Sequence, residues 1–79
     1  MRAIRRLGST PKERDETTNV SGSPDILELD DGSFAVIGVD ITDELGYQPL
    51  PDARCAPDER IVRVTRKTLL AARKDIPEA

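Results

Sequence analysis

The segment 24–42, which reads PDILELDDGSFAVIGVDIT, places the strongest constraint on the fold. Two β-rich runs meet in it at Asp31 and Gly32. Asp-Gly is a preferred pair for a two-residue type I′ turn, because both central residues need a positive φ and glycine adopts it without strain. The segment therefore predicts an antiparallel β-hairpin over about residues 25–41.

A two-residue turn fixes which residues face each other across the hairpin. Leu29 then faces Phe34, and Ile26 faces Ile37. One face is predicted to carry Leu27, Leu29, Phe34 and Val36, and the other Ile26, Ile37, Val39 and Ile41. The second strand is thus apolar on both faces, which is typical of a central or doubly covered strand. Gly38 interrupts this strand and predicts a bulge or a close approach of another backbone segment.

The chain before the hairpin has a different character. Residues 1–23 combine low hydrophobicity, many polar side chains and no sustained period, which predicts a disordered N-terminal arm. The remaining residues, 24–79, are then a single small α+β domain, since 79 residues suffice for no more than one.

The residues after the hairpin predict one helical turn and an irregular connection. Thr42 can cap the turn and Gly46 can close it. Three prolines between residues 46 and 59 exclude a regular helix or a central strand there. We expect this segment to cross one edge of the sheet, held by Tyr47 and Leu50.

The C-terminal part predicts a strand followed by a helix. Residues 60–65, RIVRVT, form the third strand, and a helix runs from residue 65 or 66 to about 75, where Pro77 limits it. An apolar stripe of this helix faces the sheet: Leu69, Ala72 and Ile76. The expected fold is a β-β-β-α module, with the antiparallel hairpin and third strand packed against one C-terminal helix. Its other sheet face stays uncovered.

The chain is small, and its core is lean. Its composition is 37% hydrophobic and 3% aromatic. Domains of this size usually need a disulfide, a metal or oligomerisation to be stable. Cys55 is the only cysteine and there is no histidine, so an internal disulfide is excluded and a structural zinc is disfavoured. Together with the uncovered sheet face, this predicts a homodimer; docking on a partner protein is the alternative.

The sequence also predicts a location. One cysteine, and no apolar run of signal-peptide or membrane-span length, indicate a cytoplasmic protein without a membrane partner.

Charge is segregated along the chain. Residues 1–14 carry five basic residues and one acidic residue, residues 15–59 carry twelve acidic residues and one basic residue, and residues 60–79 carry six basic residues and two acidic residues. One interpretation is that the basic ends lie against the acidic middle or are simply solvated. The other is an electrostatic recognition surface for a charged partner.

The predicted helix carries the candidate partner-binding residues. Arg66 and Arg73 share one flank, Lys67 and Lys74 share the next, and Leu70 lies between these rows. An apolar residue among cations is a suitable binding anchor. It is also often a leucine half-covered by the aliphatic stems of Lys and Arg.

Chemical signatures of an enzyme are missing from the sequence. Cys55 follows Arg54, but no histidine is present to act as its base. Each carboxylate pair has a structural explanation at a turn, a helix start or a loop end: Asp30 with Asp31, Asp43 with Glu44, and Asp58 with Glu59. The calcium-loop pattern fails because Leu45 stands at the sixth position from Asp40, and there is no glycine-rich phosphate loop. We therefore expect no catalytic residue, metal site or cofactor.

Two stretches, PDILELDDGSFAVIGVDITDEL and APDERIVRVTRKTLLAARKDI, resemble a group of short, acidic, uncharacterised actinobacterial proteins. The resemblance covers about the last two-thirds of the chain. It implies an accessory role beside regulators or within specialised-metabolite clusters, and it supplies no catalytic residues.

The sequence thus predicts a non-enzymatic, regulatory protein-binding module that uses the cationic helix face around Leu70. Two alternatives remain. One is a nucleic-acid-associated transcriptional regulator that uses the basic arm and helix, although the chain is acidic overall and has no recognised reading motif. The other is a scaffold or substrate peptide read by a modifying enzyme of a biosynthetic cluster.

Overall fold

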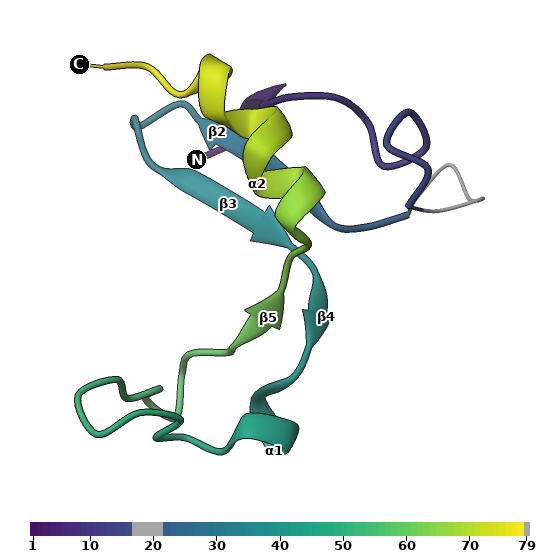
Figure 1. Ribbon diagram of the computed structural model, residues 1–79. Coiled ribbons are helices and arrows are strands. Elements are labelled where there is room, and N and C mark those ends of the chain that lie inside the picture. The colour runs from purple at the N-terminus through teal and green to yellow at the C-terminus, as the bar shows by residue number, and fades with distance from the viewer. Residues whose placement is uncertain (17–21, 79) are drawn as a thin grey trace.

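The computed structural model describes residues 1–16 and 22–78 (Figure 1). Its elements are β1 (Ala3–Arg6), β2 (Asp25–Leu29), β3 (Phe34–Ile37), β4 (Val39–Asp40), α1 (Thr42–Leu45), β5 (Val62–Arg63), α2 (Arg66–Ala72) and the 3₁₀ helix η1 (Arg73–Asp75). Strands β1, β2 and β3 form a sheet in that order, while β4 and β5 form a separate ribbon. The α+β class is confirmed.

The N-terminal residues 1–16 are ordered, so the predicted disordered arm is wrong there. Strand β1 pairs antiparallel with β2 and supplies the third strand of the sheet. Ion pairs reinforce the pairing: Arg5 Nε lies 2.6 Å from Glu28 Oε1, and Arg6 Nε lies 2.9 Å from Asp25 Oδ2. The basic start of the chain therefore does lie against acidic residues of its middle. The part of the predicted arm at residues 17–21 lies outside the described residues.

The hairpin of β2 and β3 is present, but its turn differs from the predicted one. Only Gly32 of the central pair has a positive φ, +88°. The N–H of Gly32 donates to the carbonyl of Leu29 at 3.1 Å, and the N–H of Leu29 donates to the carbonyl of Ser33 at 2.9 Å. This is the pattern of a three-residue loop closed by a bulge with glycine at its first position.

The longer turn shifts the register by one residue. Leu27 pairs with Ala35, and Ile26 pairs with Val36. A one-residue slip turns every side chain of one strand to the other face. The predicted face sets are therefore wrong, and Val36 shares the face of Ile26 in place of Ile37.

Strand β3 is an edge strand, not the predicted central or doubly covered one. Among the strands that the structure describes, β2 alone pairs with it, and its side chains at Phe34, Val36 and Ile37 are exposed. The apolar composition of β3 therefore leaves a hydrophobic surface in place of a filled core.

The predicted third strand pairs outside the sheet. Residues Val62–Arg63 pair with Val39–Asp40, so β4 and β5 form a short ribbon that leads away from the sheet (Figure 1). Gly38 lies where the chain leaves β3. A Cβ on Gly38 would clash with the carbonyl oxygen of Arg63, which confirms the predicted close approach of another backbone segment.

Helix α1 forms the predicted single turn beyond the ribbon. Its first residue, Thr42, is buried, and the Thr42 hydroxyl accepts a 2.8 Å hydrogen bond from the N–H of Ile61. The predicted cap at Thr42 is wrong, because Thr42 is the first helical residue and the N-cap position is Ile41, which makes no side-chain cap. Asp40 Oδ1 accepts from the Thr42 N–H at 3.0 Å and so satisfies one free donor of the first turn. The loop 46–59 lies at the far end of the ribbon and not across an edge of the sheet (Figure 1).

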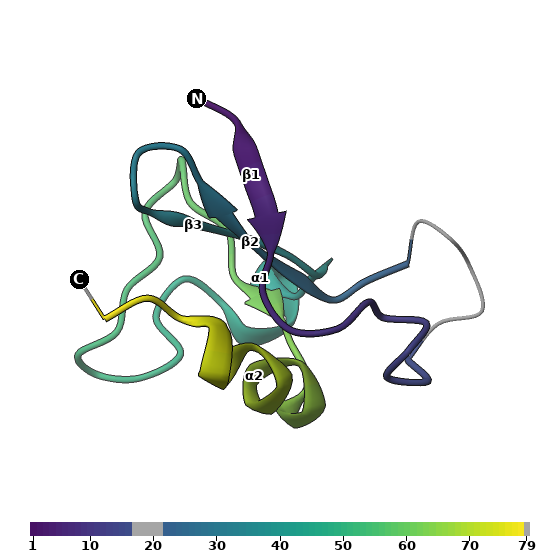
Figure 2. The ribbon, with the colours of Figure 1, turned by 90° about the horizontal axis from the view of Figure 1, so that it is seen from above.

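Helix α2 covers one face of the sheet, and the small core lies between them (Figure 2). The buried apolar residues of the core are Leu7, which directly follows β1, Ile26 of β2 and Ala72 of α2. Within the described residues, no helix has the length and apolar character needed to cross a membrane.

Candidate protein-binding surface

Helix α2 begins where the sequence predicts. The Thr65 side chain accepts a 3.2 Å hydrogen bond from the N–H of Thr68, which satisfies one of the free donors of the first turn. The helix continues as η1 to Asp75, and Pro77 follows two residues later. Both ends agree with the predicted range.

The buried face of α2 differs in part from the predicted stripe. Ala72 is buried as expected, but Leu69 and Ile76 are more than half exposed. Thr68 is buried in their place. Apolar periodicity could not identify Thr68, because a threonine enters a core only when a partner for its hydroxyl is present.

That partner is Glu16, from the arm predicted to be disordered. Glu16 Oε2 accepts from the Thr65 hydroxyl at 2.5 Å, and Glu16 Oε1 accepts from the Thr68 hydroxyl at 3.2 Å. Arg14 Nε donates to the same Oε1 at 2.9 Å, and both side chains of this ion pair are more than nine-tenths buried. The arm is thus fastened to the start of α2 by a buried polar cluster.

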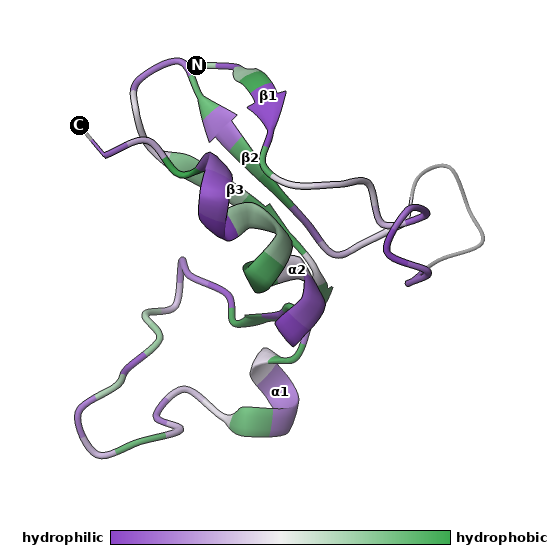
Figure 3. Ribbon diagram, turned by 45° about the horizontal axis from the view of Figure 1, so that its top comes forward, coloured by the Kyte–Doolittle hydropathy of each residue, from purple (hydrophilic) through white to green (hydrophobic). Residues whose placement is uncertain are grey.

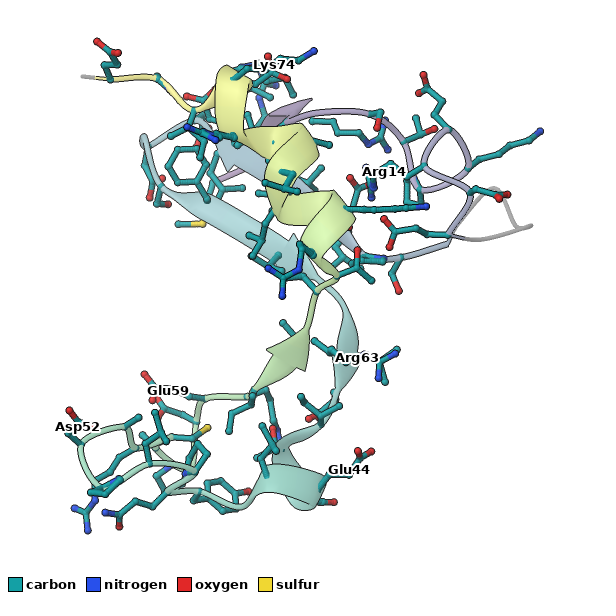
Figure 4. All side chains as sticks on the ribbon, viewed as in Figure 1. Arg14, Glu44, Asp52, Glu59, Arg63 and Lys74 are labelled. Atoms are coloured by element: carbon teal, nitrogen blue, oxygen red, sulfur yellow. The ribbon has the colours of Figure 1, made fainter. Side chains whose placement is uncertain are left out.

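The Arg14 guanidinium is satisfied on all sides. Besides Glu16, it donates to the carbonyl of Pro24 at 2.6 Å and to the carbonyl of Ser9. In Figure 4, Arg14 lies on the arm beside the start of the helix. A buried charge is tolerated when it is paired and hydrogen-bonded, and here each of the three guanidinium nitrogens has an acceptor.

A second attachment joins the arm to the C-terminal end of the helix. The N–H of Gly8 donates to Asp75 Oδ2 at 2.7 Å, and Arg5 Nη2 donates to the Asp75 carbonyl at 2.7 Å. Gly8 has a φ of +78°, and a Cβ there would lie 2.7 Å from the carbonyl carbon of Ala71. Arm and helix therefore touch backbone to backbone.

The buried cluster makes a prediction about acid stability. Hydrogen bonding to the Thr65 hydroxyl is the main cause that holds the pKa of Glu16 below its ordinary 4.5; burial opposes this, and Arg14 and Thr68 reinforce it. A lowered folded-state pKa stabilises the fold above pH 4.5 and loses that contribution as the pH falls through the folded-state pKa. We expect chemical denaturation to show little change in stability from pH 7 to about 5.5 and a decline below about 4.5.

Glu16→Gln is expected to make that decline shallower, because it removes one of the titrating groups. Hydrogen bonds also lower the pKa of Asp31 and of Asp40, through Ser33 and Thr42, so part of the decline remains in the variant. An unchanged slope in Glu16→Gln would contradict the assigned role of Glu16.

All five predicted binding residues are exposed, but they divide into two groups. Lys67 lies on the side of the arm, where its Nζ donates to the Arg14 carbonyl at 3.3 Å. Lys74 lines a cavity of about 450 Å³ on the same side, between the helix and the arm. Arg66 and Arg73 lie on the opposite flank of the helix, which they share with Leu69.

Leu70 projects between the two groups and is 59% exposed. It borders the same cavity as Lys74, where Glu13 and Asp75 also contribute carboxylates. Among residues 1–16 and 22–78, no carboxylate forms an ion pair with Arg66, Lys67, Arg73 or Lys74. The surface therefore offers one apolar side chain and several cations to a partner.

Sequence reasoning did not anticipate a neighbouring apolar surface. Figure 3 shows hydrophobic residues along β3 and in the middle of α2. Phe34 and Val36 are 42% and 45% exposed, and Leu69 is 56% exposed. Their apolar character is visible in the sequence, where it predicts buried positions, but the structure exposes all three side chains.

Other candidate residues have local structural partners. Asp31 Oδ1 accepts from the N–H of Ser33 at 2.9 Å, and Glu59 Oε1 accepts from the N–H of Ala56 at 2.8 Å. Cys55 is half-buried, with its Sγ 3.7 Å from the Ala56 carbonyl oxygen. In the part of the chain that the structure describes, no three His, Cys, Asp or Glu side chains are grouped as a metal site would require.

Comparison with known proteins gives no relative. No protein-family model, no curated protein and no solved structure matches this chain.

Proposed function

We propose that this chain is a non-enzymatic accessory module that binds a partner protein through the outer face of α2. The observation that carries the proposal is Leu70, an apolar side chain 59% exposed among cations that form no ion pair with the described residues. Exposed apolar residues at the centre of a polar rim are the usual anchors of protein interfaces. The accessory role is also the one that the resemblance to short actinobacterial proteins implies.

A protein partner fits this surface better than nucleic acid. The net charge of the chain is −3, and its only aromatic residues are Phe34 and Tyr47. Nucleic-acid surfaces combine a dominant positive field with stacking or groove-reading groups. The cations of α2 are more suitable for acidic residues at the rim of a protein interface, where they steer association.

Leu70→Glu is expected to reduce capture of the partner at least tenfold, because it replaces the apolar anchor by a charge. The fold should be retained, since substitutions at exposed positions usually change stability by no more than about 0.5 kcal/mol. The measurement is affinity capture from the native cell with the tagged chain, quantified by mass spectrometry, together with thermal unfolding of both proteins.

Leu50→Glu is the matched control, because Leu50 is 60% exposed and lies in the loop 46–59, away from α2. Equal capture by wild type and Leu70→Glu would contradict the proposal, as would unfolding of Leu70→Glu. Recovery of nucleic acid whose binding falls steeply with salt would favour the alternative of a nucleic-acid-associated regulator.

A further inference from the structure

Strand β3 has an open hydrogen-bonding edge. In the antiparallel pair with β2, Leu29 and Ser33 form the hydrogen-bonded pair next to the turn. Because such pairs alternate with non-bonded ones, Ala35 and Ile37 direct their backbone groups toward β2. The N–H and C=O groups of Phe34 and Val36 therefore point away from the sheet, and no described strand pairs with them.

This edge lacks the features by which proteins usually prevent strand addition. The opposite edge, β1, carries Arg5 and Arg6 and has an irregular register between Ala3 and Arg5. Charges and bulges of that kind protect an edge. Strand β3 reads FAVI, with no charge, no proline and no bulge along it.

Helix α2 places positive charge on the sheet face that carries Phe34 and Val36. Val36 pairs with Ile26, whose side chain lies under α2 in the core, so Phe34 and Val36 face the helix side. The flank of α2 at Ala71, continued by Asp75 of η1, meets the arm, next to β1. The opposite flank therefore faces β3, and it carries Arg66 and Leu69 of α2 and Arg73 of η1.

The surroundings favour one extended strand over a second copy. A second copy would bring its own Arg66 and Arg73 toward those of the first, and like charges close together oppose association. An extended segment that carries carboxylates places opposite charge beside the same cations instead.

We propose that the edge of β3 binds an extended segment of the partner protein by strand addition. The segment carries apolar residues opposite Phe34 and Val36, and carboxylates that meet Arg66 and Arg73. This inference rests on the proposed protein-binding function and names the kind of partner that the surface accepts: main-chain hydrogen bonds provide affinity, and alternate side chains provide specificity.

The test uses the full chain, labelled with ¹⁵N, and synthetic seven-residue peptides with blocked ends. In ETVTVTE, the valines and glutamates fall on one face of the strand. We expect this peptide to slow amide exchange at Phe34 and Val36 at least tenfold, while the amides of Ala35 and Ile37, already bonded to β2, change little. The charge-reversed peptide KTVTVTK should bind at least tenfold more weakly, and ETVTVTE with N-methylated valines should not bind.

Two variants test whether the peptide binds at the edge of β3. Val36→Lys should abolish binding of ETVTVTE, and Leu50→Lys, at an equally exposed position in the loop 46–59, should retain it. Absence of protection at millimolar peptide, or equal binding of both charge forms, would overturn the proposal. Protection of Phe34 and Val36 that rises with protein concentration alone would also overturn it, because it would show a second copy at the edge.

The two proposals fail separately. Leu70 does not lie on the flank that faces β3, so Leu70→Glu should still bind ETVTVTE. A Leu70→Glu protein that keeps both peptide binding and partner capture would refute the proposed role of the outer face alone. Loss of peptide binding in Val36→Lys with partner capture retained would refute strand addition as the docking mode.

Discussion

Arg14→Met is expected to lower the free energy of unfolding by about 3 kcal/mol, the scale for removing one partner of a buried ion pair. Methionine fills much of the space of the arginine stem but leaves the Glu16 carboxylate buried without its cation. The carbonyls of Ser9 and Pro24 lose their donor as well. For a domain of this size, the thermal midpoint should fall by roughly 15 °C.

Lys12→Met is the matched control, because it removes the same charge from an exposed position of the same arm. Its effect on stability should be no more than about 0.5 kcal/mol. Urea denaturation of both variants checks the prediction. Equal urea midpoints for Arg14→Met and Lys12→Met would mean that the buried contacts of Arg14 do not stabilise the fold.

Gly8→Ala is expected to cost a similar amount, about 3 kcal/mol, from two sources. The φ of +78° costs an alanine about 1 kcal/mol. The added Cβ would also lie 2.7 Å from the carbonyl carbon of Ala71, a backbone atom that cannot rotate away. The helix must then move off the arm, and overpacking of this kind costs about 2 kcal/mol.

Gly32→Ala separates the two sources, because Gly32 also has a positive φ but has no atom within 4 Å of the added Cβ. It should therefore show only the conformational cost, about 1 kcal/mol. The difference between the two variants in a denaturation experiment measures the crowding at the arm. If Gly8→Ala and Gly32→Ala lose the same free energy of unfolding, crowding of the added Cβ against Ala71 does not destabilise the fold.

Local signals predicted the elements well. The Asp-Gly pair identified the hairpin, Thr65 and Pro77 bounded the last helix, and the segment from Thr42 to Gly46 gave a helical turn. Each of these depends on interactions within a few residues, which the sequence displays directly. The predicted hairpin register was wrong because the loop includes Asp30 as well as Asp31 and Gly32. An Asp-Gly pair is compatible with both the two-residue and the three-residue loop, so the pair alone does not decide between them.

Long-range pairing could not be predicted in the same way. Strand β1 joins the sheet through backbone bonds and through charges at Arg5 and Arg6, so its residues show no apolar pattern. The signal in the sequence was the basic segment 1–14 followed by the acidic segment 15–59. That charge pattern is equally typical of a solvated surface. Likewise, the sequence alone predicts that Thr68 is a surface residue, because its burial depends on the hydrogen bond from its hydroxyl to Glu16.

The candidate surface was predicted in part. Arg66, Leu70 and Arg73 are exposed as the binding hypothesis requires. The contribution of β3 was missed, because apolar residues on both sides of a strand usually indicate burial. Only the strand order places Phe34 and Val36 at an edge.

The fastening of the arm to the helix has a consequence for how the chain folds as it is made. The bond between Glu16 and Thr65 spans 49 residues, and the bond between Gly8 and Asp75 spans 67. Contacts so far apart in sequence slow folding, because the entropy of closing the loop must be overcome before they form. During synthesis the arm has no partner on α2 until residues 65–75 have left the ribosome. The apolar hairpin is therefore completed before its covering helix, and this face of the sheet stays open until α2 has been made.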